Sequence, residues 1–104
     1  MEITSKQRAF LKGLAMKEEA ILQLGKGGVT PEFTESLDEA LRARELVKIG
    51  VQKAWEGDLR EAAETLAERT GAVCVQVVGR KVVFYRQGDK KHRKIELPRP
   101  KKQV

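Results

Sequence analysis

The sequence has few of the residues that carry catalytic chemistry. It contains one cysteine, Cys74, and one histidine, His92. A single cysteine excludes an internal disulfide and a multi-cysteine metal site, and it fits a reducing compartment. His92 has no second histidine to share a metal ion, and Cys74 fits a half-buried strand position better than a nucleophile. We therefore expect no enzyme activity, no cofactor and no metal.

Long apolar segments are also missing. No stretch approaches the ~20 apolar residues of a membrane-spanning helix, and the N-terminus lacks the apolar core of a secretory leader. We expect a soluble, cytoplasmic protein with no membrane partner.

Charge, by contrast, is abundant and unevenly placed. Of the 104 residues 35% are charged, and the formal net charge is +6. Residues 86–104 carry eight lysines and arginines against two acidic residues, so the rest of the chain is balanced. We predict one domain over residues 1–86, extending to about 98, and a basic, partly ordered tail over 87–104. Such a tail is either a tether for a polyanion or a solubilising segment.

Hydrophobic periodicity predicts seven elements in the order α-β-α-β-α-β-β. Helix starts are marked by the pairs Thr4/Gln7 and Asp58/Glu61 and by Thr30-Pro31, and a helix end by Gly71. Two strand–helix–strand units imply parallel pairing, and a final hairpin adds an antiparallel pair. The predicted fold is a single α/β domain with a mixed four-stranded sheet packed with helices. The expected helices are 5–17, 31–44 and one between Asp58 and Gly71, and the expected strands are 20–24, 46–51, 72–78 and 81–85.

The final hairpin is predicted in most detail. Gly79-Arg80 is a two-residue loop with glycine first, as a type II′ turn prefers. This loop predicts two opposed pairs that form one apolar face with Val73, namely Val77 with Val82 and Val75 with Phe84. The residues expected on the other face are Cys74, Gln76, Lys81 and Tyr85. Tyr85 is expected to cover an edge of the sheet and Trp55 a helix start, although either ring could instead stack on an unpaired base.

A glycine-rich turn, Gly25-Lys26-Gly27-Gly28, joins a predicted strand to a predicted helix. This arrangement offers backbone N–H groups, a helix dipole and one ammonium group to an anion. A P-loop is excluded because glycine follows Lys26, and a dinucleotide fingerprint is excluded by Thr30. A G-x-x-G clamp on a nucleic-acid phosphate is compatible with the pattern, and so is a plain tight connection.

Charge sign also separates by element. The first helix carries Lys6, Arg8 and Lys12, whereas the second and third helices are acidic on their outer faces. Together with Lys26 and the tail, which includes Arg93 and Lys94, the first helix would form one basic side for a polyanion.

Several segments, in this order, resemble the CRM domain, the RNA-binding module typified by the small bacterial protein YhbY. The match spans residues 3–98, and its specificity lies in the series of segments. The segments are Thr4-Ser5-Lys6-Gln7-Arg8, Leu11-Lys12-Gly13-Leu14-Ala15, Gln23-Leu24-Gly25-Lys26-Gly27-Gly28-Val29-Thr30, Ala40-Leu41-x-x-x-Glu45-Leu46-Val47-Lys48, Thr70-Gly71-Ala72, Val75-Gln76-Val77-Val78-Gly79, Tyr85-Arg86 and Arg93-Lys94-Ile95-x-Leu97-Pro98.

The resemblance implies a fold similar to the C-terminal domain of translation initiation factor three, and RNA binding through the G-x-x-G loop. It also implies an association with precursors of the large ribosomal subunit. We therefore predict an RNA-binding ribosome-assembly factor that contacts ribosomal RNA through Gly25, Lys26, Gly27, Gly28, Lys6, Arg8, Lys12, Arg93 and Lys94. The alternative is a protein-interaction module that docks on a ribosomal protein through its acidic helices and its hairpin.

Overall fold

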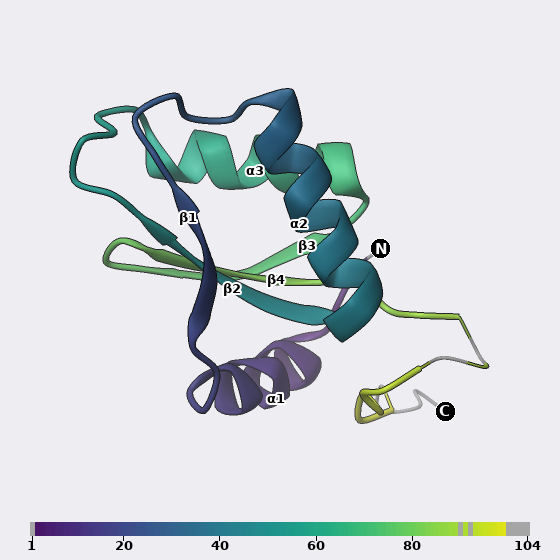
Figure 1. The fold of residues 1–104 in the computed structure, drawn as a ribbon. Coiled ribbons are helices and arrows are strands. Elements are labelled where there is room, and N and C mark those ends of the chain that lie inside the picture. The colour runs from purple at the N-terminus through teal and green to yellow at the C-terminus, as the bar shows by residue number, and fades with distance from the viewer. Residues whose placement is uncertain (1, 90, 92, 100–104) are drawn as a thin grey trace.

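A computed structural model describes residues 2–89, 91 and 93–99, and it has the predicted element order (Figure 1). The first helix ends at Ala15, two residues earlier than predicted. His92 and the last five residues of the predicted tail lie outside the described residues. The elements are α1 (Ser5–Ala15), β1 (Ala20–Leu24), α2 (Pro31–Arg44), β2 (Leu46–Val51), α3 (Leu59–Thr70), β3 (Val73–Val78) and β4 (Lys81–Tyr85).

The four strands form one mixed sheet in the order β1-β2-β4-β3. Strands β1 and β2 are parallel, and β4 runs antiparallel to both of its neighbours. The α/β prediction is therefore confirmed. Helices α2 and α3 cover one face of the sheet, and α1 covers part of the other (Figure 1).

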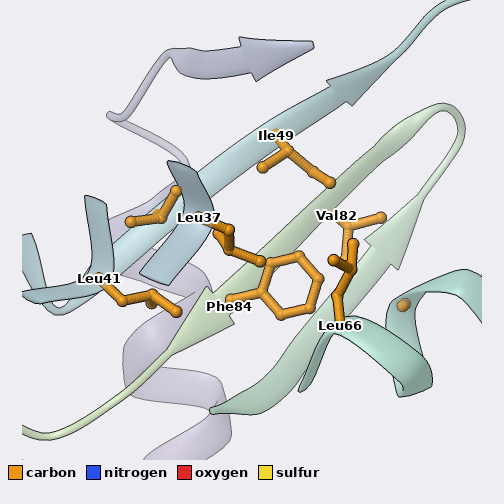
Figure 2. Close-up of a cluster of buried hydrophobic side chains, with 8 residues drawn as sticks. Leu37, Leu41, Ile49, Leu66, Val82 and Phe84 are labelled. Carbon is orange, nitrogen blue, oxygen red and sulfur yellow. The ribbon is translucent and has the colours of Figure 1, made fainter. Parts of the chain in front are cut away.

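The main core lies between the sheet and the two helices α2 and α3. Figure 2 shows Leu37 and Leu41 of α2 and Leu66 of α3 around Phe84 of β4. Each of these four side chains is at most 1% exposed. Burial of a side chain of this size contributes about 1.5–3 kcal/mol, so this cluster holds both helices on the sheet.

A second, smaller core lies under α1. Leu11 and Ala15 of α1 pack there with Leu46, Val83 and Tyr85 of the sheet. The prediction that Tyr85 covers a sheet edge is wrong, because β4 is a central strand and Tyr85 is fully buried. Burial raises the pKa of the Tyr85 hydroxyl, and the nearby Glu45 carboxyl raises it further.

Of the two residue pairs predicted in the hairpin, one is confirmed and one is wrong. Val77 pairs with Val82, but Phe84 pairs with Cys74 and not with Val75. The reason is a register shift between Cys74 and Gln76, which turns Cys74 toward the main core and Val75 toward the core under α1. Burial raises the pKa of the Cys74 thiol, which keeps it in the unreactive thiol form.

Candidate nucleic-acid interface

Residues 25–28, which we call the glycine turn, leave β1 at the edge of the sheet and lead toward α2 (Figure 1). The Gly28 N–H donates to the Gly25 carbonyl oxygen at 3.0 Å, which closes the turn. Gly28 has φ +71°, and a Cβ there would lie 2.7 Å from Nε1 of Trp55. Both the backbone conformation and the indole ring therefore require glycine at this position.

The apex of the glycine turn is open to solvent. Lys26 and Gly27 are both exposed. Among the described residues, their backbone N–H groups have no acceptor within the protein. A Cβ at Gly27 would make only an ordinary contact, 3.6 Å from Cγ2 of Thr30. The apex therefore presents backbone donors and one ammonium group together, which is the chemistry of an anion site.

The N-terminus of α2 contributes less to this site than the sequence suggested. The Thr30 side chain accepts from the Phe33 N–H at 3.0 Å, and Pro31 has no N–H. Glu32 adds a negative charge in the first turn. The Thr30 cap thus satisfies one N–H of the first turn, and the donors at the exposed apex lie in the turn that precedes the helix.

The loop between β2 and α3, residues 52–58, lies against the glycine turn. The Gln52 N–H donates to the Leu24 carbonyl oxygen at 2.9 Å, and a Cβ on Gly25 would approach the Gln52 side chain at 3.3 Å. Arg80, at the tip of the β3–β4 hairpin, donates to the carbonyl oxygens of Val51, Gln52 and Trp55. One arginine therefore braces this loop beside the turn. The sequence predicts Arg80 in a hairpin loop but does not indicate that its side chain contacts residues 51–55.

The structure does not bring the other predicted basic residues to the glycine turn. Helix α1, with Lys6, Arg8 and Lys12, lies on the opposite face of the sheet and at the other end of β1 (Figure 1). The Arg8 guanidinium donates to the carbonyl oxygens of Cys74 and Val75, at 2.8 and 2.6 Å, where the β3 register shifts. Arg8 therefore stabilises β3 at the register shift.

Two further predicted residues lie beyond β4. The Lys94 ammonium donates to the Ala43 carbonyl oxygen at the end of α2 at 2.6 Å. Arg93 is exposed and lines a polar hollow of about 520 Å³ with Thr4 and Gln7 at the start of α1. The basic residues thus form two separate regions, one at the glycine turn and one around α1 and Arg93.

Glu45 has a structural role that the sequence did not reveal. It is 1% exposed, it follows α2, and it has φ +67°, which is strained for a residue with a side chain. Its carboxyl oxygens accept from the backbone N–H groups of Gly88, Lys94 and Ile95 at 2.8–3.0 Å. Glu45 therefore holds the segment after β4 against the domain, where Ile95 and Leu97 join the core under α1.

Arg86 anchors the start of the same segment. Its guanidinium donates to the Asp38 carboxylate at 2.5 Å and to the Thr70 carbonyl oxygen at 2.7 Å. The hydrogen bond from Arg86 to the Asp38 carboxylate holds the pKa of Asp38 below its usual value. The proposed boundary between domain and tail at residue 86 stays a prediction.

Other kinds of site find little support in the part of the chain that the structure describes. There, no three histidine, cysteine, aspartate or glutamate side chains gather where they could hold a metal ion. None of the helices described is long and apolar enough to cross a membrane.

Comparison with known proteins decides the family. The model of the CRS1 / YhbY (CRM) domain matches residues 3–86. The chain belongs to this family. The CRM-domain chain is 38% identical over 96 residues to the Probable RNA-binding protein YqeI of Bacillus subtilis. This match covers 92% of this chain and 99% of YqeI. It is 33% identical over 97 residues to a Haemophilus influenzae protein named as an RNA-binding protein, with 93% and 96% covered.

A solved structure has the same fold. The solution structure of the hypothetical protein SAV1595 from Staphylococcus aureus, proposed to bind RNA, matches with a TM-score of 0.78 and 40% identity. The match covers 93% of this chain and all of that one. The predicted family and fold are therefore confirmed.

Proposed function

We propose that this CRM-domain chain binds RNA and that the glycine turn holds an RNA phosphate. The observation that carries the proposal is the exposed apex, where the Lys26 ammonium and the unpaired N–H groups of Lys26 and Gly27 occur together. The absence of a side chain at Gly27 lets a phosphate approach the exposed backbone closely. The names of the relatives in Bacillus subtilis and Haemophilus influenzae support RNA as the polyanion.

We further propose that the target is ribosomal RNA in a precursor of the large subunit, where the protein acts in the cytoplasm as an assembly factor. This finer assignment rests on the resemblance to stand-alone bacterial YhbY proteins. Phosphate contacts position RNA without reading its sequence, so selectivity would come from RNA shape or from neighbouring ribosomal proteins. Lys6, Lys12 and Arg93 would form a second contact region around α1, and the tail would add long-range attraction.

The proposal predicts a steep loss of affinity with salt. Each phosphate that the protein neutralises contributes about 0.7–0.9 to the slope of log affinity against log salt concentration. Three to four contacts would therefore give a slope of about 2–3.5. Fluorescence anisotropy of a labelled large-subunit ribosomal RNA fragment, titrated with the protein at several salt concentrations, measures this slope. Tight binding with a flat salt response would contradict phosphate recognition.

A further inference from the structure

A hollow of about 330 Å³ opens beside Trp55 and runs along α3 from Asp58 to Arg69. Val29, which directly follows the glycine turn, lines one part of it. Asp58 and Glu61, the cap and first turn of α3, line another. The hollow therefore lies next to the glycine turn, and no residue of the turn itself lines it.

Two glycines leave room for the Trp55 side chain in the wall of this hollow. A Cβ on Gly28 would collide with Nε1 of the indole, and a Cβ on Gly57 would collide with Cζ2 and Cε2 of the same ring. Its backbone is held by Arg80, whose guanidinium donates to the Trp55 carbonyl oxygen at 3.1 Å. The ring is only half-buried and forms part of the wall of the hollow. A large aromatic surface is thus held in place beside the glycine turn, which is what a stacking platform requires.

The charges in the hollow select the kind of group that fits. The carboxylates of Asp58 and Glu61 accept hydrogen bonds from N–H groups, and the guanidinium of Arg69, which also lines the hollow, donates them to carbonyl oxygens and ring nitrogens. A flat, neutral ring with N–H donors on its edge satisfies both the indole and the carboxylates. Unpaired nucleobases have this form, and proteins read them by stacking and by contacts to the Watson–Crick edge.

We infer that this hollow takes one unpaired RNA base, stacked on Trp55, while a neighbouring phosphate lies on the glycine turn. The inference rests on the proposed function and adds a base subsite to it. Bases with an amino group, guanine above all, are preferred over uracil. Guanine offers adjacent N–H donors to a carboxylate, whereas the single N–H of uracil is flanked by carbonyl oxygens that the carboxylates repel.

The protein carries its own reporter, because Trp55 is its only tryptophan. Titration with a short single-stranded uridine oligonucleotide that contains one guanosine should quench the Trp55 emission in a saturable way, because the base stacks on the indole. Anisotropy of the same labelled strand measures binding independently. Binding by anisotropy with unchanged Trp55 emission overturns the base subsite and leaves the proposed function standing. No binding of any RNA overturns the proposed function itself.

Two variants separate stacking from a purely structural role of the ring. Trp55→Ala should weaken binding of the strand roughly 5- to 150-fold, and Trp55→Phe clearly less, since it keeps a ring. A base carries no charge, so the salt slope should not change in Trp55→Ala. If the ring only shapes the glycine turn, phosphate contacts would be lost and the slope would fall with the affinity, which overturns the inference. Circular dichroism checks the fold, and Trp55→Phe carries the test if Trp55→Ala does not fold.

A third variant tests the proposed hydrogen bonds between the base and the carboxylates. Glu61→Ala should abolish the preference for the guanosine-containing strand over pure uridine without changing the fold, since Glu61 is exposed. Equal affinity of the native protein for the two strands would overturn the proposed base preference.

Discussion

Replacing both Lys26 and Gly27 by aspartate is expected to weaken RNA binding roughly 30- to 100-fold at about 0.1 M salt. The change removes the ammonium group and places two carboxylates where the phosphate would lie. Both residues are exposed, and a side chain at Gly27 meets only an ordinary contact. The fold should therefore survive, which circular dichroism checks. Anisotropy with a large-subunit ribosomal RNA fragment measures the affinity.

The chain contains a matched control for this variant. Lys12 and Gly13 form the same dipeptide on α1, both are exposed, and a Cβ on Gly13 meets nothing within 4 Å. Replacing both by aspartate changes the net charge equally but at the other end of β1. We expect a loss of only a few-fold from this variant, because it removes one contact of the second region around α1 and adds long-range repulsion. An equal or larger loss would move the main RNA contact to α1 and contradict the assignment of the glycine turn.

Removal of the Glu45 carboxyl group is expected to release the segment after β4. In Glu45→Ala, the N–H groups of Gly88, Lys94 and Ile95 lose their buried acceptor. Leaving one such donor unsatisfied costs about 1–3 kcal/mol, and detachment of the segment relieves that cost by exposing Ile95 and Leu97. We expect the free energy of unfolding, measured in urea, to fall by about 2–4 kcal/mol. Trypsin should then cleave after Arg93 much faster than in the native protein.

Two further variants test the reason for that loss. Glu45→Gly also removes the carboxyl group but relieves the strained φ, so it should release the segment with a smaller loss of stability. Glu39→Ala removes an exposed carboxylate from α2 and should change neither property. If trypsin cleaves native protein and Glu45→Ala at the same rate, Glu45 does not hold the segment.

The secondary structure could be predicted because its signals are local. Thr4 with Gln7 forms the predicted capping box, Thr30 and Asp58 cap their helices, and Gly71 ends α3 in the left-handed conformation. The register of the hairpin could be predicted only in part. Its shift at Cys74 is accompanied by two hydrogen bonds from Arg8, a residue 66 positions away, and no local pattern encodes that contact.

In the candidate site, too, the local features could be predicted and the long-range contacts could not. The glycine turn is a contiguous motif, so the sequence alone pointed to it. Trp55, Arg80 and Glu45 act through partners that are distant in the chain, such as Gly28, Val51 and Ile95. Tyr85 was misplaced because its position depends on strand order, which places β4 inside the sheet. Such groups become visible only once the strands and loops are arranged in space.

The most direct test of the account is a map of the RNA-binding surface in solution. Amide chemical shifts of the ¹⁵N-labelled protein would be followed by NMR during titration with a large-subunit ribosomal RNA fragment. The account predicts the largest changes at residues 25–30 and 52–58, with smaller ones along α1 and none on the outer faces of α2 and α3. Changes centred on α2 and α3, with the glycine turn unaffected, would contradict it and favour a module that docks on a protein partner.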